Sequence, residues 1–193
     1  PALSIAEEQQ LLNTCKQRED GYWYDVIVFA IDTGVRHDGE LNRITPEQID
    51  FGKNHLVFKR PKTGKWSTIP LTASAFEVFY RRREIALIDT NIWFFPVSKS
   101  SIRHNWDKYI KLSGLSDEYT PYSTRHTFIT RLVEADVSPK AVQHLAGHKS
   151  IETTLQYYTH STNEVLENAI TKLEEYKKAK SKKFKSVYNW RFG

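Results

Sequence analysis

The spacing of apolar residues predicts a chain built mainly from helices. Leu3 to Cys15 is amphipathic, and Ser4 followed by Glu7 forms a capping-box pattern at its start. Trp23 to Thr33 is strongly apolar and ends at Gly34, the residue type favoured just past a helix end. Further helices are expected over residues 39–44, 72–87, 100–112, 124–135, 139–145, 151–158 and 161–180.

One part of the chain alternates between apolar and polar residues instead. His55 to Arg60 and Trp66 to Leu71 have this period, and the Pro-Lys-Thr-Gly-Lys sequence of residues 61–65 joins them as a tight, basic turn. We therefore expect an α+β fold that is mainly helical, with a small antiparallel sheet in the N-terminal half. The sequence contains no internal repeat, so we expect one domain over residues 1–180 and a basic, aromatic tail over residues 181–193.

Length and composition exclude several classes of protein. A chain of 193 residues, 39% hydrophobic and 26% charged, suits one folded domain. The longest apolar runs, Val26 to Ile31 and Ile92 to Val97, are too short to cross a bilayer, and the N-terminus has no signal-peptide pattern. Cys15 is the sole cysteine, which fits a reducing compartment. We expect a cytoplasmic protein without a membrane partner, and a piece of a longer chain because it starts at Pro1 and lacks Met.

The net charge of +5 does not decide the function by itself. Residues 172–193 hold eight basic and two acidic residues, a net charge of +6, so the rest of the chain carries about −1. A basic tail of this kind is commonly a solvated helix end or a flexible arm. Local motifs are therefore a better indication of the function than the net charge.

Two of these motifs lie in the first half of the chain. Arg36 directly follows a predicted helix end, where a surface arginine is stabilised by the helix dipole. Lys62 lies in the predicted hairpin turn, where charge commonly protects edge strands. A lysine on such a turn can also act as a proton donor in a neighbouring site.

A third motif is Tyr-Ser-Thr-Arg-His-Thr-Phe at residues 122–128. Arg125 and His126 begin a helix whose apolar face is expected to be Phe128, Ile129, Leu132 and Val133. Because the helix dipole disfavours an arginine near an N-terminus, Arg125 indicates a bound anion such as phosphate. We interpret His126 as a hydrogen-bonded packing residue rather than a ligand.

A fourth motif is Leu-Ala-Gly-His at residues 145–148, followed by Tyr-Tyr-Thr-His at residues 157–160. His144 and His148 are four residues apart, a spacing that can indicate a zinc pair on a helix. Gly147 is expected to end that helix, and no carboxylate accompanies the pair at metal-ligand spacing. These features favour a site without a metal.

Taken in order, these motifs resemble the signature of the tyrosine recombinases, the phage-integrase family, over residues 3–160. The resemblance implies the catalytic domain of a site-specific DNA recombinase, which integrates or excises a mobile element through a covalent 3′-phosphotyrosine intermediate. It implies no cofactor, ATP or metal. The residues that match the family's catalytic positions are Arg36, Lys62, Arg125, His148 and the nucleophile Tyr158, with Tyr157 as an adjacent alternative nucleophile.

The chain departs from the family pattern at two positions. Tyr122 stands three residues before the second arginine, where the family usually has a histidine, which weakens general-base assistance from that position. The acidic residue that usually follows the first arginine by three is here Glu40, one place later, behind Gly39. We interpret this as a one-residue insertion that leaves the role of Glu40 open.

The resemblance also implies partners. We expect double-stranded DNA, four protomers on two DNA sites, and an N-terminal DNA-clamping domain that this chain lacks. The C-terminal segment has an apolar stripe that either packs on its own domain or exchanges with a neighbouring protomer: Val165, Ala169, Leu173 and Tyr176. Two alternatives remain, a type IB topoisomerase-like activity and a non-catalytic DNA-binding module of the same fold.

Overall fold

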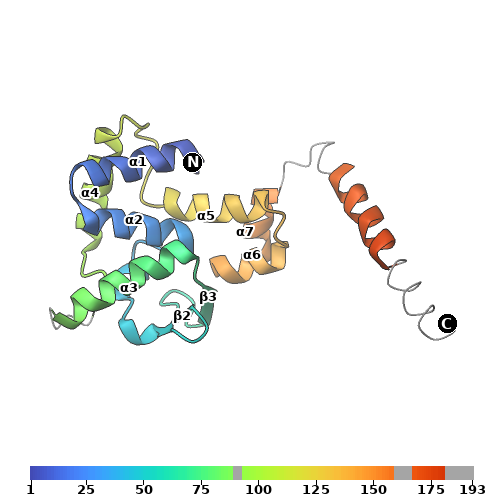
Figure 1. Ribbon diagram of the computed structural model, residues 1–193, viewed down its shortest axis with the longest axis horizontal. Coiled ribbons are helices and arrows are strands. Elements are labelled where there is room, and N and C mark those ends of the chain that lie inside the picture. The colour runs from blue at the N-terminus through green and yellow to red at the C-terminus, as the bar shows by residue number, and fades with distance from the viewer. Residues whose placement is uncertain (89–92, 159–166, 181–193) are drawn as a thin grey trace, which may run out of the picture. The chain divides into compact units, whose positions relative to one another are not determined.

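The computed structural model describes residues 1–88, 93–158 and 167–180 (Figure 1). The chain divides into two compact units, Pro1–Tyr157 and Tyr158–Gly193. The first unit contains the sheet and the helices α1 to α7. The elements are α1 (Ile5–Gln17), α2 (Gly21–Thr33), η1 (Leu41–Arg43), η2 (Pro46–Gln48), β1 (Ile49–Asp50), β2 (His55–Lys59), β3 (Trp66–Pro70), α3 (Ala73–Ile88), α4 (Lys99–Leu112), α5 (Ser123–Glu134), α6 (Pro139–Ala146), α7 (Ile151–Leu155) and η3 (Gln156–Tyr158).

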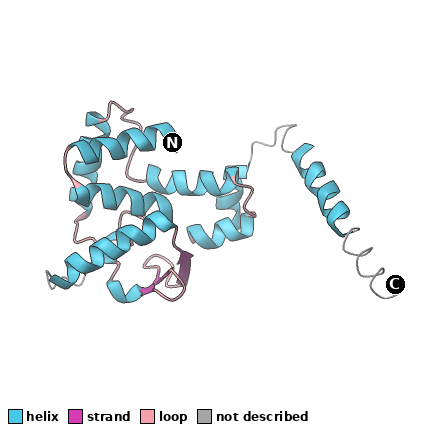
Figure 2. Cartoon of the chain, viewed as in Figure 1, coloured by secondary structure: helices cyan, strands magenta, loops and turns pink. Residues whose placement is uncertain are grey.

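The expected fold class is confirmed, because the domain is mainly helical with a small antiparallel sheet (Figure 2). The predicted caps also form. Ser4 and Glu7 make a capping box at α1, and Gly34 ends α2 in the left-handed conformation. Ser138 caps α6, whose first residue is Pro139, by accepting a hydrogen bond from the backbone N–H of Ala141.

The structure corrects two local expectations and adds one strand. The helix expected over residues 39–44 is only the short 3-10 turn Leu41–Arg43. The helix expected over residues 151–158 is divided into α7 and the 3-10 helix η3. The short strand β1 was not expected, because two residues are too few to show a period.

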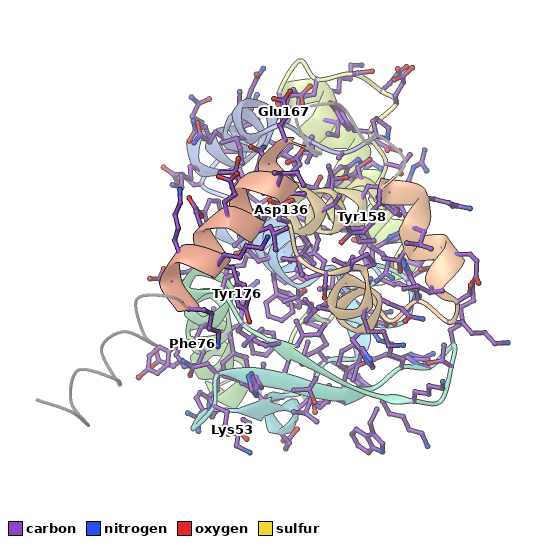
Figure 3. The ribbon with its side chains drawn as sticks, turned by 90° about the vertical axis from the view of Figure 1, so that its right-hand side faces the viewer. Lys53, Phe76, Asp136, Tyr158, Glu167 and Tyr176 are labelled. Carbon is purple, nitrogen blue, oxygen red and sulfur yellow. The ribbon has the colours of Figure 1, made fainter. Side chains whose placement is uncertain are left out.

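The predicted hairpin is confirmed, and β1 extends it to a three-stranded sheet in the order β1-β2-β3. Leu56 pairs with Ile69, and both are buried together with Phe58. The alternate positions of β2 and β3 point away from the core, as the period of two requires. Figure 3 shows the strands side by side, with Lys53 in the turn that precedes β2.

Helix α2 forms the centre of the first unit. Residues 26–31 are all buried, which is the pattern of a helix covered on every side. Helices α1, α3 and α5 pack against it, and Figure 1 shows α2 between α1 and α3. The end of α2 at Gly34 therefore fixes the position of the segment that carries Arg36.

Helix α5 buries a different face from the one expected. Ile129 is buried, but Leu132 and Val133 are only half-buried. The buried positions also include Arg125 and Thr127, whose hydroxyl accepts a hydrogen bond of 2.8 Å from the backbone N–H of Leu3. The expected face was wrong in part because a polar side chain can also be buried when it has hydrogen-bond partners.

The second unit contains a helix at residues 167–180, which is part of the helix expected over residues 161–180. Every side chain of this helix is exposed, including Leu173 and Tyr176, the latter labelled in Figure 3. Residues 159–166, with Val165, and the tail at residues 181–193 lie outside the described residues. The domain boundary expected at residue 180 stays a prediction. No helix in the described part of the chain is long and apolar enough to span a membrane.

Candidate functional site

A buried carboxylate organises the first part of the site. Glu40 is only 3% exposed and accepts hydrogen bonds from Arg36, at 2.9 Å from the backbone N and 2.5 Å from Nη1. It also accepts from Nη1 of Arg60, at 3.0 Å and 3.2 Å to its two oxygens. The insertion before Glu40 therefore does not remove it from the site, because its carboxylate still holds the first arginine.

Arg60 is a site residue that the sequence analysis missed. It is 1% exposed, its Nε donates to Oγ of Ser67 at 2.6 Å, and its Nη2 donates to the carbonyl of Leu145 at 2.8 Å. The alternation of β2 contained a signal for it, since residues 56, 58 and 60 share the buried face. An arginine at such a position needs buried partners. Arg60 therefore ties the hairpin to the end of α6.

Arg125 lies at the start of α5 and is 1% exposed. Its Nη1 donates to the carbonyl of Gly34 at 2.7 Å, and its Nη2 donates to the carbonyl of Ala146. Its Nε is buried and has no hydrogen-bond partner within the described protein. Burial, and next the positive charge of Arg36, lower the pKa of Arg125 to about 10, so it stays charged at neutral pH.

His148 follows the turn at the end of α6. Its Nδ1 lies 2.9 Å from Oγ1 of Thr154, an interaction in which either group can donate. Burial lowers the pKa of His148 to about 4, and the charges of Arg125, Arg36 and Arg60 act in the same direction. The imidazole is therefore neutral at pH 7, and the three guanidinium groups are close enough to affect it.

Two glycines let the backbone turn beside these arginines. Gly147, at φ +65°, lies against Arg60, and a Cβ at this position would overlap the guanidinium. Gly34, at φ +61°, lies against the ring of Phe128 in the same way. Both the left-handed backbone and the lack of space require glycine. The Gly-His and Gly-Val-Arg motifs thus combine a helix end with a site residue.

A row of aromatic and imidazole rings borders the arginines. The hydroxyl of Tyr157 lies 2.9 Å from Nδ1 of His126, and its ring stacks on His148 with the centroids 6.3 Å apart. Tyr122 is 39% exposed and meets His126 and His37 edge-on. The pKa of Tyr157 is raised by burial, and the charge of Arg125 opposes that shift. His126 is thus a hydrogen-bonded residue beside the site.

Lys62 and Tyr158 are the two remaining residues of the expected set. Lys62 is exposed in the hairpin turn, where the backbone N–H of Gly64 donates to the carbonyl of Arg60 at 2.8 Å. Tyr158 is the last residue of η3 and the first of the second unit, and Figure 3 labels it. The structure thus brings together Arg36, Arg125 and His148 from the expected set, with Tyr122 at the edge.

The charges of the cluster indicate the kind of ligand that it can bind. Three guanidinium groups face one carboxylate, so the cluster has an excess of positive charge beside a neutral imidazole. Planar guanidinium groups bind phosphate oxygens with paired hydrogen bonds. Within the described residues, no three His, Cys, Asp or Glu side chains lie close enough together to hold a metal ion. The excess of positive charge favours an anionic ligand such as phosphate.

Comparison with protein-family models gives one decisive match, the phage integrase family, over residues 2–164. The chain belongs to the phage integrase family. The match covers most of the chain, so the family resemblance inferred from the motifs is confirmed.

Curated proteins of this family are similar in sequence. The tyrosine recombinase XerC of Chlamydia pneumoniae is 31% identical over 128 residues, 61% of this chain and 41% of that protein. The transposase from transposon Tn916 of Enterococcus faecalis is 27% identical over 199 aligned positions, 84% of this chain and 49% of that protein. The chain thus spans less than half the length of these two relatives.

Solved structures give the same family. The Tn1549 transposon integrase, in complex with circular intermediate DNA, is 26% identical with a TM-score of 0.72, over 88% of this chain and 64% of that one. A lambda integrase dimer bound to a COC′ core site is 26% identical with a TM-score of 0.65, over 81% of this chain and 58% of that one. The arginine cluster therefore lies in a recombinase catalytic fold.

Proposed function

We propose that the chain is the catalytic domain of a site-specific DNA recombinase, which cuts and rejoins DNA strands to integrate or excise a mobile element. The observation that carries this proposal is the cluster of Arg36, Arg125 and His148. The guanidinium groups of this cluster give it an excess of positive charge. Family membership supplies the reaction class, and the cluster supplies a site for the phosphate that reacts.

In this proposal the two arginines bind the non-bridging oxygens of the cleaved phosphate. Negative charge builds up on these oxygens in the transition state, so fixed donors lower the barrier. The hydrogen bonds of Arg36 to Glu40 and of Arg125 to Gly34 hold both guanidinium groups in place before DNA binds. His148 adds a further donor. Loss of one such donor typically costs about 3–4 kcal/mol of barrier.

The nucleophile in this proposal is Tyr158, and the proton donor is Lys62. The phenol of Tyr158 gives its proton to solvent water as its oxygen attacks the phosphorus. The bond from phosphorus to the 5′ oxygen breaks, and the ammonium group of Lys62 gives its proton to that oxygen. The product is a 3′-phosphotyrosine and a free 5′ hydroxyl. Rejoining reverses the step with a new 5′ hydroxyl, so the reaction consumes no ATP and uses no metal or cofactor.

Tyr157 is the alternative nucleophile, and an observation favours testing it. Its phenol lies in the described site, hydrogen-bonded to His126 and stacked on His148. We assign it instead to the support of these two rings, because the matching family motif has its tyrosine two residues before a histidine, as Tyr158 is before His160.

The proposed partners are double-stranded DNA and further copies of this chain. The solved relatives are described as DNA complexes, and one of them as a dimer on DNA. We propose a tetramer that joins two DNA sites through the C-terminal segment. The exposed apolar residues Leu173 and Tyr176 support a contact surface there. The enzyme would act in the bacterial cytoplasm, where its DNA substrate lies.

Covalent capture from a random DNA library tests the proposal whichever DNA sequence the protein recognises. Nicked duplexes of randomised sequence are incubated with the protein, and DNA that stays attached after boiling in detergent is sequenced. We expect attachment through a 3′ phosphate to Tyr158, enrichment of one sequence, and loss in Tyr158→Phe but not in Tyr157→Phe. Loss in Tyr157→Phe alone would overturn the assignment of the nucleophile.

The same assay separates the two alternatives. Attachment without enrichment of any sequence, together with relaxation of supercoiled plasmid, would favour a type IB topoisomerase-like activity. Enrichment of one sequence in the DNA recovered with the protein before boiling, with no DNA attached after boiling, would favour a non-catalytic DNA-binding module. Either result would overturn the proposed recombinase.

A further inference from the structure

The hairpin and α6 enclose a basic cavity that the proposed mechanism does not use. It has a volume of about 280 Å³, and its lining includes Lys65 and Trp66 from the hairpin and Lys140, His148 and Lys149 from α6 and the turn after it. His148 also belongs to the arginine cluster. The cavity is therefore directly beside the proposed site of the cleaved phosphate.

The charged side chains that line this cavity are all positive. None of the residues that line it is acidic. Lys65, Lys140 and Lys149 are exposed, and within the described residues none of them forms a salt bridge. Lys140 donates to Oε1 of Gln143, a neutral partner, at 3.1 Å. Three uncompensated ammonium groups around one cavity favour an anionic ligand.

An exposed indole completes the cavity. Trp66 is 71% exposed, the largest exposed fraction among the large apolar side chains of the described residues. It lies on β3 opposite Lys59 of β2, and Lys65 precedes it in the turn, so it has a basic neighbour on each side. A tryptophan this exposed receives little hydrophobic stabilisation from packing within its own domain. Its flat face suits a sugar or base, because aromatic side chains stack on nucleotides without regard to sequence.

We infer that Trp66 and this basic cavity bind the DNA strand next to the cut: the lysines hold a second backbone phosphate, and the indole packs on the nucleotide attached to it. The inference rests on the proposed function, and it adds a contact that fixes the register of the strand. His148 lies between the two phosphate positions, since it lines the cavity and belongs to the arginine cluster. A strand held at both positions cannot slide during cleavage.

Binding and cleavage of the captured DNA sequence test this contact. We expect Trp66→Ala to weaken DNA binding at least tenfold and to slow adduct formation, whereas Trp66→Phe keeps most of both because a flat ring remains. The matched control is Tyr80→Ala, since Tyr80 is 53% exposed on α3 and does not line the cavity. We expect that variant to behave as the wild type.

A neutral substitute for one phosphate locates the second phosphate position. Methylphosphonate, which has no charge, replaces each phosphate near the cut in turn. We expect one flanking position to weaken wild-type binding and to have no further effect on a Lys140→Ala, Lys149→Ala double variant. That variant should also lower the slope of log affinity against log salt concentration by about one, because the lysines together neutralise one phosphate.

The outcomes separate this inference from the proposed function. If the wild type forms no covalent adduct, the proposed function fails. If the wild type forms an adduct but Trp66→Ala matches Tyr80→Ala in binding and rate, only the inference fails. If Trp66→Ala leaves single-site cleavage intact and impairs only the joining of two sites, the indole contacts protein, and the inference is wrong.

Discussion

At the scale of single residues, Glu40 positions both Arg36 and Arg60. Its charge is buried and compensates two guanidinium groups, one of which is only 1% exposed. Glu40→Gln removes that charge and leaves Arg60 without a counter-ion in the interior. We expect a loss of about 3–5 kcal/mol in the free energy of unfolding, measured by urea denaturation.

The exposed pair of Arg103 and Asp107 on α4 is the control for this prediction. Its two side chains are 62% and 51% exposed, with 2.9 Å between Nε and Oδ2. Asp107→Asn should change the free energy of unfolding by less than about 1 kcal/mol, because solvent screens exposed pairs. Equal losses of unfolding free energy in the two variants would show that the buried ion pairs of Glu40 stabilise the fold no more than an exposed pair does.

His148 should make the stability of the domain depend on pH. Its pKa is about 4 in the folded protein, against an ordinary value of 6.5. As pH falls from about 6.5 to about 4, the unfolded chain takes up a proton that the folded chain does not, so stability falls in this window. Urea titrations at several pH values should show a shallower fall in His148→Asn.

Part of the fall should remain in His148→Asn, because burial also lowers the pKa of His126 and of His37. An identical fall in the wild type and in His148→Asn would mean that the imidazole of His148 is not held neutral by its surroundings. The three guanidinium groups would then not lie close to this imidazole in solution.

At the scale of elements, the turn at the end of α6 joins the hairpin to the site. Gly147 and Gly64 both have φ +65°, but only at Gly147 would a Cβ meet another side chain, that of Arg60. Gly64→Ala should cost about 1–2 kcal/mol for the left-handed backbone. Gly147→Ala should cost about 1–3 kcal/mol more, because Arg60 must move.

Thermal or urea unfolding measures both glycine variants under the same conditions. Equal losses of stability would show that Arg60 does not pack tightly against the turn. A larger loss in Gly147→Ala supports the view that the Gly-His motif sets the contact between α6 and the hairpin, as well as placing His148.

The elements also show which parts of the fold could be predicted. Helices α1, α2 and α6 were predicted because their signals are local: Ser4, Gly34 and Ser138 act within a few residues. The 3-10 turn at residues 41–43 was expected as a longer helix, and Glu40, the residue before it, binds Arg60, twenty residues away. The spacing of residues along the chain cannot reveal a contact between residues so far apart in the sequence.

The candidate site shows the same limit. The motifs identified Arg36, Arg125 and His148 as candidates through a family resemblance, but not the partners that hold them in place. The carbonyl groups that Arg125 binds belong to Gly34 and Ala146, 91 and 21 residues away in the chain. Only the packing of α2, α5 and α6 brings these backbone groups together.

At the scale of the whole molecule, the chain spans less than half of the curated relatives described above. We expect it to bind the captured DNA sequence weakly by itself, because much of a DNA clamp would come from a further domain. A gel-shift comparison with a longer chain that adds such a domain tests this. Equal affinity of the two proteins would contradict the expectation.

The C-terminal segment should act in the assembly of protomers rather than in the chemistry. We expect deletion of residues 181–193 to impair the joining of two DNA sites more than the cleavage of one. Adduct formation on a single site and the recovery of two-site complexes measure the two steps separately. Loss of cleavage on the single site would assign the tail to the catalytic step.

The central claim is that two guanidinium groups act on one phosphate, and the single-turnover rate of adduct formation tests it most directly. Arg36→Lys and Arg125→Lys keep the charge but remove the paired donors. With Arg103→Lys as the exposed control, and the fold checked by circular dichroism, we expect both site variants to react about 100–1,000-fold more slowly. DNA affinity should change by only a few-fold. Rates within tenfold of the wild type for both would contradict the account.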